Sequence, residues 1–319
     1  MPILAYVEHH ENEPVKASLG VLGRAAALEG EATAFVAGEG VRALAEGLGR
    51  FGASRVLVAD DASLEAPLPQ PRVDVLERVV SERGFDTVLF AASVLTADVA
   101  AGLAARLGAG LNWDLVDIRL ADGELQGTRP AFGDSVLVEV GWKGEPRLAL
   151  VRSGTFEPSE AGGEAELEDV PVHVQEWSLR TRMLEPARTD ETGPSIEDAD
   201  VVVAGGRGLG GPEKFALLEE LARELGGAVA ATRAVVDAGW YPYASQVGQT
   251  GRSVSPRLYL ACGISGAIQH KVGMQSSGTI VAINKDPNAP IFEYSDVAVI
   301  GDLHEIVPRL TELVRERRA

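Results

Sequence analysis

The sequence predicts an α/β protein of two domains: an N-terminal Rossmann-like parallel sheet with added antiparallel hairpins, and a C-terminal doubly wound domain. At 319 residues the chain is too long for one ordinary core. Short apolar segments alternate with amphipathic segments of about a dozen residues, which is typical of parallel strands joined by crossover helices. A charged segment with two prolines and a glycine, 180–198, interrupts this alternation, so we expect domains at 1–188 and 189–319, with a hinge at 187–192.

The first part of the N-terminal domain is expected to contain four strand–helix pairs. Ser93 and Thr96 are candidates for capping the fourth helix. His9 and His10 follow the first strand, where we expect them in a solvated loop. No P-loop and no Gly-x-Gly-x-x-Gly motif follows any of these strands. The domain therefore has the strand–helix alternation of a nucleotide-binding domain but no phosphate-binding motif. The expected strands are 3–7, 33–37, 55–59 and 87–92, and the expected helices are 15–26, 41–48, 73–80 and 99–107.

The pattern changes after residue 111, where short strand-like segments are separated by turn residues. The segments 115–120, 135–140 and 147–151 predict antiparallel hairpins added to the parallel sheet. The acidic segment 161–169 is expected to be a solvated loop. The alternation of 172–177 predicts one more strand.

Composition limits the classes of partner and the location of the protein. The formal net charge of -18 excludes nucleic acid and anionic membrane surfaces as partners, and suits either attraction to a basic protein surface or simple solubility. The single cysteine, Cys262, allows no disulfide or thiolate metal cluster within the chain, and we expect a buried thiol. Because no apolar run approaches about 18 residues and the N-terminus does not resemble a secretory signal, we expect a cytoplasmic protein, at most peripheral to a membrane.

The C-terminal domain opens with a strand, a glycine loop and a helix. After the apolar strand 201–204, Gly206, Gly208 and Gly211 fit the Gly-x-Gly-x-x-Gly pattern of dinucleotide-binding loops. Such a loop lets a phosphate approach backbone N–H groups at a helix N-terminus. The next strand, however, ends in Thr232 and Arg233 instead of the acidic residue that holds the ribose of NAD. An arginine there favours a phosphate or an electron-rich ring.

A second strand, turn and helix follow at 257–270. Gly263 and Gly266 open the backbone, Ser265 is expected to cap the helix, and His270 is expected one turn into it. Two further strands, 279–283 and 297–300, lead to Asn284 and to Asp302. Asp302 and Glu305 resemble a capping pair and predict the start of a last helix. Turn and cap roles would explain Asn284 and Asp302 without a ligand.

Several segments of this half resemble one known family. QVGQTG at 246–251, GISGAIQH at 263–270 and INKDP at 283–287 resemble the FAD domain of the electron transfer flavoprotein alpha subunit, in order and without large gaps from about residue 201. The N-terminal domain resembles the family only in layout. The cofactor-binding residues that this resemblance implies are Arg207, Thr232, Arg233, Val247, Gly248, Gln249, Thr250, Ser265, Gly266, Ala267, Ile268, Gln269, His270, Asn284, Asp302 and Leu303.

The resemblance implies one non-covalent FAD in a cleft against a beta subunit. Residues 247–250 would lie beside the isoalloxazine ring, and Asn284, Asp302 and Leu303 nearer the adenosine. His270 near the flavin O2 and Arg233 over the ring would stabilise the negative charge of the reduced flavin, and Thr250 would bond to N5. These groups would raise the flavin potential and let electrons pass one at a time. Without the resemblance, His270 and Arg233 would be ordinary core or surface residues.

The resemblance also implies a function. The chain is expected to be an electron carrier with no catalytic residue or metal site of its own, since no nucleophile, metal set or carboxylate pair stands in 201–300. It would pair with a beta subunit, take electrons from flavin dehydrogenases such as the acyl-CoA dehydrogenases of fatty acid beta-oxidation, and pass them to a quinone-linked oxidoreductase. Two alternatives remain: a flavin- or NAD-dependent dehydrogenase of a small substrate, and an adenine-nucleotide-binding module.

Overall fold

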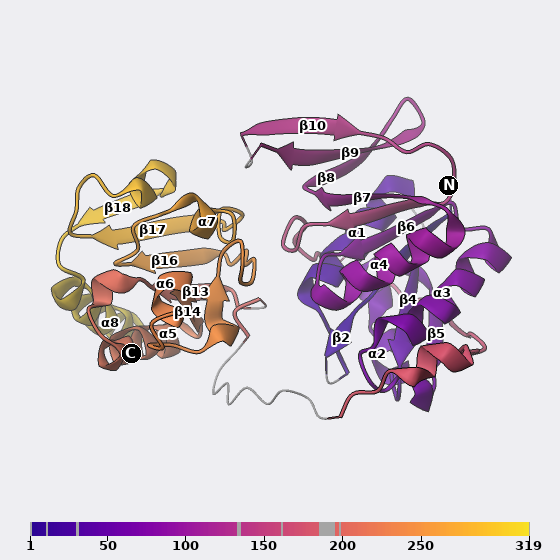
Figure 1. The fold of residues 1–319 in the computed structure, drawn as a ribbon, viewed down its shortest axis with the longest axis horizontal. Coiled ribbons are helices and arrows are strands. Elements are labelled where there is room, and N and C mark those ends of the chain that lie inside the picture. Colours follow the sequence, from indigo (N-terminus) through magenta and orange to yellow (C-terminus); the bar gives the residue numbers. More distant parts are fainter. Residues whose placement is uncertain are drawn as a thin grey trace. The chain divides into compact units, whose positions relative to one another are not determined.

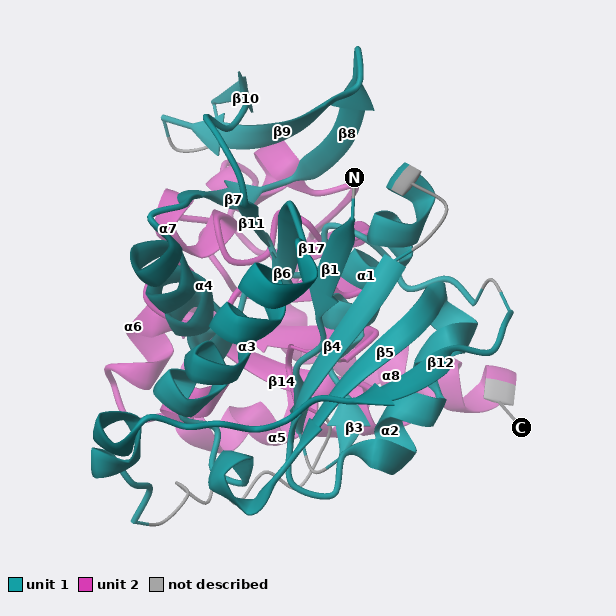
Figure 2. Cartoon of the chain, turned by 90° about the vertical axis from the view of Figure 1, so that its right-hand side faces the viewer, with its two compact units in different colours: residues 1–186 teal, residues 187–319 magenta. Residues whose placement is uncertain are grey.

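The computed structural model forms two compact units, residues 1–186 and 187–319, which are described one at a time (Figure 2). It describes residues 2–10, 12–29, 32–132, 135–160, 162–184, 195–197 and 199–318. The hinge expected at 187–192 lies outside these described residues.

Unit 1 is built on a parallel sheet of seven strands in the order β12-β5-β4-β1-β6-β11-β7 (Figure 1). Its strands are buried on both faces: in β1, Leu4 and Tyr6 join the core under α3 and α4, and Ala5 joins the core under α1 and α2. The strands and helices expected in the first 107 residues are confirmed. Their bounds are β1 Ile3–Tyr6, α1 Lys16–Glu29, β4 Ala32–Gly38, α2 Arg42–Glu46, β5 Ala53–Asp60, α3 Pro69–Arg83, β6 Thr87–Ala91, α4 Val94–Leu107, β7 Gly110–Leu115, β11 Arg147–Val151 and β12 Glu166–Asp169.

The predicted cap of α4 is confirmed. The Ser93 hydroxyl accepts a hydrogen bond from the backbone N–H of Thr96 at 3.0 Å, and the Thr96 hydroxyl accepts one from the N–H of Ser93 at 2.8 Å. These reciprocal bonds satisfy two backbone donors that the first turn of a helix leaves unpaired.

Two of the three segments predicted as hairpin strands lie in an antiparallel sheet, but its middle strand at 124–131 was not predicted and the third segment lies in the parallel sheet. β8 (Asp117–Ala121), β9 (Glu124–Ala131) and β10 (Val136–Val140) form a three-stranded antiparallel sheet in the order β10-β9-β8. The segment 147–151, expected in a hairpin, is instead a parallel strand between β6 and β7. Its last four residues are all buried, as a strand with elements on both faces requires.

Three local expectations were also wrong. The acidic segment 161–169 contains the strand β12, which pairs with β5 at the edge of the sheet. The exposed carboxylates of Glu166 and Asp169 are compatible with an edge strand. Residues 172–177 form no strand, because the backbone N–H of Gln175 donates to the Asp74 carboxylate at 2.8 Å and a 3₁₀ turn begins at Glu176. His9 is half-buried in the short strand β2 (His9–His10), which pairs with β3 (Glu13–Pro14), and its Nε2 lies 3.2 Å from the Ala37 carbonyl oxygen.

Unit 2 is built on a second parallel sheet, of six strands in the order β15-β14-β13-β16-β17-β18. Helices α5 and α8 cover one face, and loops with the short helix α7 and the turn at 290–294 cover the other. Since all strands run the same way, their carboxyl ends share one edge, called the carboxyl edge below. The bounds are β13 Val201–Gly205, α5 Phe215–Leu225, β14 Ala228–Thr232, α6 Arg233–Val236, β15 Gln246–Val247, β16 Leu258–Cys262, α7 Ile268–Lys271, β17 Thr279–Asn284, β18 Val297–Ile300 and α8 Leu303–Arg318.

The described residues contain neither a membrane-crossing helix nor a cluster of metal ligands. No helix there combines the length and the apolar character that crossing a bilayer requires. In the same part of the chain, no three His, Cys, Asp or Glu side chains gather in a way that would hold a metal ion.

Candidate functional site

The carboxyl edge of unit 2 brings the site residues predicted from the sequence together. Thr232 ends β14, Val247 ends β15 and Asn284 ends β17. Thr232 and Val247 are direct partners in the parallel pairing of their strands. Open α/β sheets bind ligands at this edge, close to the point where the strand order reverses. Here the order reverses at β13, which lies between β14 and β16.

The loop 247–250 is tied to the segment 265–270. The backbone N–H of Gln249 donates to the Gln269 carbonyl at 2.7 Å. The Gln246 amide donates to the Thr250 hydroxyl at 3.1 Å, which leaves the hydroxyl proton of Thr250 for another acceptor. The side chains of Gln249 and Thr250 are exposed. Two stretches some twenty positions apart in the sequence, 247–250 and 265–270, are therefore joined. They are called the polar strip below, although the exposed Ile268 lies in it.

The helix expected after β16 is shorter than predicted. α7 begins only at Ile268, and its N-cap is Ala267 without a side-chain bond, so Ser265 does not cap it. Gly266 has φ +90°, and the Ser265 carbonyl accepts from the N–H of Ile291 at 3.0 Å, so the chain turns sharply before the helix. The Ser265 hydroxyl is therefore exposed at the edge and free of a capping role.

His270 is buried, and both of its ring nitrogens have partners inside the unit. Nδ1 lies 3.1 Å from the Val247 carbonyl oxygen, and Nε2 lies 2.9 Å from the Tyr259 hydroxyl. Burial lowers the pKa of His270 to about 4, so the ring is neutral at physiological pH. In this arrangement the N–H donor expected near flavin O2 is not available from Nε2. Tyr259 was not predicted; a lone tyrosine inside the aliphatic strand LYLAC was its only signal.

The glycines after β13 pack two loops together instead of presenting their N–H groups to a phosphate. The N–H of Gly206 donates to the Cys262 carbonyl and the N–H of Gly208 to the Gly263 carbonyl, each at 3.0 Å. A Cβ on Gly208 would lie 2.7 Å from the Gly263 Cα, so only glycine fits there. The phosphate role expected for these two N–H groups is therefore wrong. α5 begins beyond them, at Phe215.

The remaining predicted residues surround the 263–264 turn. The Asn284 amide donates to the Ile264 carbonyl at 2.9 Å, and the Asp302 carboxylate accepts from the N–H of His304 at 2.8 Å at the start of α8. Leu303 is buried against Gly263. Asn284 and Asp302 thus carry out turn and cap roles in the structure. Arg207 is exposed beside them.

The exposed groups of this edge have the donor chemistry that FAD requires. Arg207 and Arg233 present guanidinium groups, which bind phosphate and stack on aromatic rings. The Arg233 side chain is 65% exposed and pairs with Asp237, four residues along the chain, at 3.2 Å. The hydroxyls of Thr250 and Ser265 add neutral donors. A ring and a pyrophosphate would both find partners along the strip.

Comparison with known proteins agrees with this geometry. Residues 3–175 match the family model of the electron transfer flavoprotein domain, and residues 195–275 match that of the electron transfer flavoprotein FAD-binding domain. The chain belongs to the electron transfer flavoprotein alpha subunit family. It is 44% identical over 318 residues to the electron transfer flavoprotein subunit alpha of Mycobacterium tuberculosis, covering 99% of each chain. It is 42% identical to that of Mycobacterium leprae, with 99% and 98% covered, and 39% identical to Protein FixB of Clostridium saccharobutylicum, with 98% and 96% covered.

Membership of the electron transfer flavoprotein family identifies the cofactor as FAD. The match to the FAD-binding domain model includes the loop 247–250 and the segment 265–270, the two stretches that the Gln249 and Gln269 backbones join. The resemblance predicted from QVGQTG and GISGAIQH is thereby confirmed. The assignment of individual residues to parts of FAD stays a prediction.

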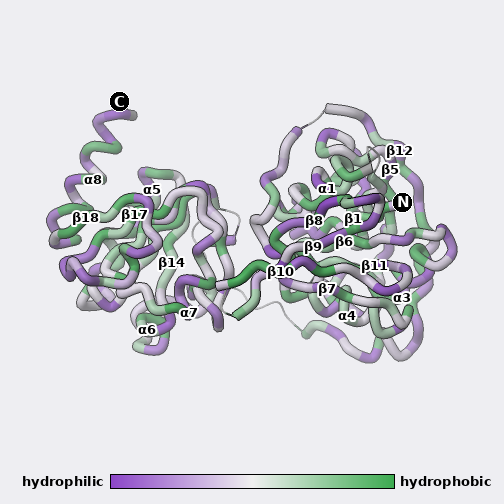
Figure 3. Tube along the Cα trace, turned by 90° about the horizontal axis from the view of Figure 1, so that it is seen from above, coloured by the Kyte–Doolittle hydropathy of each residue, from purple (hydrophilic) through white to green (hydrophobic). Residues whose placement is uncertain are grey.

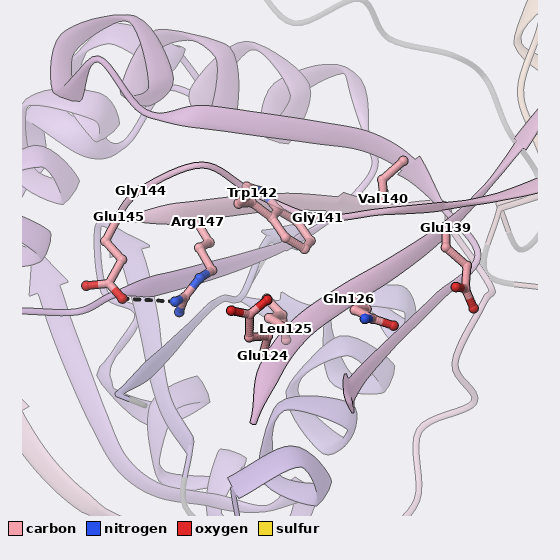
Figure 4. Close-up of a pocket in the computed structure, with 10 residues that line it drawn as sticks. All are labelled: Glu124, Leu125, Gln126, Glu139, Val140, Gly141, Trp142, Gly144, Glu145 and Arg147. Carbon is pink, nitrogen blue, oxygen red and sulfur yellow. Dashed lines mark hydrogen bonds and ion pairs between the residues drawn. The ribbon is translucent and has the colours of Figure 1, made fainter. Parts of the chain in front are cut away.

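A pocket of about 540 Å³ lies elsewhere, in unit 1 of this flavoprotein chain, beside β9 and β10 (Figure 4). Its lining includes Glu124, Glu139 and Trp142, and the Glu145–Arg147 ion pair of 2.9 Å. None of the predicted FAD residues line it. Two of its three carboxylates are ion-paired, Glu139 with Arg119 and Glu145 with Arg147.

Proposed function

We propose that this chain is the alpha subunit of a heterodimeric electron transfer flavoprotein. The domain 189–319 holds FAD, which takes electrons from flavin dehydrogenases such as acyl-CoA dehydrogenases and passes them one at a time to a quinone-linked oxidoreductase. The protein works in the cytoplasm as a carrier. The observation that supports this most is the polar strip at 247–250 and 265–270 on a chain that matches its family over nearly its whole length.

The residue chemistry of the strip favours a carrier over an enzyme. Cys262, the only thiol of the chain, is fully buried, and burial raises its pKa to about 12, so it is no nucleophile. The neutral His270 is bonded to a carbonyl and a tyrosine, and among the described residues no serine or carboxylate is paired with it. The bound flavin would supply the electron-accepting chemistry, and these side chains would bind, orient and tune it.

The N-terminal domain 1–188 is proposed as the scaffold and the beta-subunit interface. β10 is an edge strand whose outer backbone groups have no neighbouring strand in its sheet. It is also apolar, as the green hydropathy colouring of β10 in Figure 3 shows. Val136, Leu137 and Val138 are exposed, Leu137 by 65%. An exposed apolar edge is a hazard that proteins cover, and a subunit partner would cover it.

Replacing Leu137 with aspartate is expected to weaken assembly with the beta subunit about 30-fold, on the order of 2 kcal/mol, because a charge would be buried in the interface. The heterodimer dissociation constant measures this. Val94→Asp is the matched control, since Val94 is 87% exposed on α4 of the same unit and should tolerate the charge. Equal losses in both variants would contradict the proposed interface.

The function itself is tested on the complex co-expressed with its beta subunit. We expect a yellow heterodimer with one FAD contacting the alpha subunit, bleached by a flavin dehydrogenase and its substrate and reoxidised by a protein acceptor. A colourless complex that takes up no FAD overturns the proposal. Steady turnover of a small substrate without a protein acceptor would favour a dehydrogenase, and bound adenine nucleotide without flavin would favour a nucleotide-binding module.

Arg233→Ala is expected to lower the flavin midpoint potential by about 50 mV, close to a tenfold change for a one-electron step. The exposed guanidinium is a positive charge at the edge where reduced flavin would carry its negative charge, and its removal destabilises the reduced form. Redox titration of the holo-complex measures the change. Arg309→Ala removes the same charge from the exposed surface of α8, where Arg309 pairs with Glu312, and should leave the potential unchanged.

A further inference from the structure

Two consecutive hydrogen bonds inside unit 2 connect the polar strip to a buried tyrosine of the sheet. The connection begins at the Val247 carbonyl, passes through the imidazole of His270, and ends at the hydroxyl of Tyr259, the second residue of β16. Tyr259 is fully buried, and its ring lies 6.1 Å from that of His270 at 55°. Val247 of the polar strip and Tyr259 of the core are therefore hydrogen-bonded to the two nitrogens of the same imidazole.

The partners determine which nitrogen of His270 carries the proton. A carbonyl oxygen can only accept, so Nδ1 bears the hydrogen and donates it to Val247. Nε2 then offers a lone pair, and the Tyr259 hydroxyl donates to it. The titratable groups around this pair, Tyr259, Cys262 and Tyr294, all have their pKa raised by burial and are neutral at physiological pH. His270 is thus held as one neutral tautomer.

We propose that Tyr259 is a positioning residue of the cofactor site: its hydroxyl fixes the orientation and tautomer of His270, and it acts on the flavin only through that ring. This rests on the proposed function, in which FAD binds along 247–270. The tyrosine points its hydroxyl at Nε2 from the sheet, whereas Val247 belongs to the strip itself. Tyr259 can therefore change the electrostatics of the strip without contributing an atom to it.

Loss of the hydroxyl has a defined consequence. In Tyr259→Phe the Nε2 lone pair has no donor, and a hydrogen bond that favoured the neutral ring is gone, so His270 binds a proton more readily. A more easily protonated ring beside the flavin stabilises the negative charge of its reduced form. The flavin midpoint potential in Tyr259→Phe should therefore move to a more positive value.

The first test reads the tautomer directly in the holo-heterodimer labelled with ¹⁵N-histidine. The chain has 5 histidines, and His270→Gln identifies the signal of His270 by its loss. We expect a neutral ring with the proton on Nδ1 and a hydrogen-bonded Nε2, and in Tyr259→Phe an Nε2 signal shifted to that of an unbonded nitrogen. A wild-type proton on Nε2, or an unchanged spectrum in Tyr259→Phe, would overturn the proposal.

The second test is a double-mutant cycle on the flavin potential. Tyr259→Phe should shift the potential in the wild-type background and have no effect in the His270→Gln background. Equal shifts in both backgrounds, or none in either, would show that Tyr259 does not act through His270. Tyr241→Phe is the control, because it removes a tyrosine hydroxyl of the same unit that donates to the Glu219 carboxylate and not to His270. If the complex binds no FAD, the proposed function fails, and the tautomer in the flavin-free complex still tests the Tyr259 contact.

Discussion

Gly266→Ala is expected to cost the heterodimer its FAD. Gly266 has φ +90°, where an L-residue is strained, and it lies in the middle of the segment 265–270. An added Cβ would lie 2.3 Å from the backbone nitrogen of Ile291 and 2.4 Å from the Tyr294 hydroxyl. Because Ile291 contributes backbone, it cannot rotate away, and the turn at 290–294 must shift as a whole.

The strain and the clash together should reduce FAD affinity about 100-fold, which corresponds to about 3 kcal/mol. The shift would also break the 2.5 Å hydrogen bond from the Tyr294 hydroxyl to the Gly266 carbonyl, which joins the segment 265–270 to the 3₁₀ turn at 290–294. Flavin retained per heterodimer after gel filtration, and FAD titration of the stripped complex, measure the loss.

Gly226→Ala is a matched control for the backbone strain alone. Gly226 ends α5 in the same unit with φ +68°, and a Cβ there meets nothing within 4 Å. The Gly226→Ala heterodimer should keep its FAD, and its free energy of unfolding should fall only slightly. If Gly226→Ala loses FAD as readily as Gly266→Ala, the effect is general destabilisation and the close contact at Gly266 is not the cause.

Strand and helix positions followed from the sequence wherever the apolar period was regular, as in β1, β4 and β6. The strands that pair with 147–151 could not be predicted from the sequence. This segment directly follows a hairpin, and its true partners, β6 and β7, are distant in sequence. Four buried residues in a row would fit any central strand, so the pattern leaves the neighbour open. β12 escaped prediction because its acidic residues are exposed and only Leu167 packs on the core.

The polar strip was predicted from sequence motifs, because glycines and polar residues that follow parallel strands lie at the carboxyl edge of an α/β sheet. The motifs did not reveal what these glycines do. Gly206 and Gly208 look like a phosphate loop, yet their N–H groups bond to the 262–263 backbone. Tyr259 was missed for a related reason: a tyrosine in a buried strand is ordinary, and only the folded structure shows that its hydroxyl meets His270.

Asp74→Ala is expected to lower the free energy of unfolding of unit 1 by about 3 kcal/mol. The Asp74 side chain is 1% exposed and accepts from the Arg106 guanidinium and from the backbone N–H of Gln175. Arg106 also lies over the Trp177 ring, 4.8 Å from its centroid. Alanine would leave the partly buried Arg106 guanidinium one carboxylate short and the Gln175 N–H unpaired, and the segment 170–180 would lose its hydrogen bond to α3.

Hydrogen exchange of the Gln175 amide in the intact heterodimer measures this attachment, and a 3 kcal/mol loss corresponds to exchange faster by about 100-fold. Glu77→Ala is the matched control, because Glu77 bonds the same guanidinium at 3.0 Å but is 37% exposed, so water replaces it at a cost below about 1 kcal/mol. If both variants speed exchange equally, Arg106 and not the buried Asp74 holds the segment. If neither does, the segment is held by its apolar contacts, Val170 and Val172, against the core under α3 and α4.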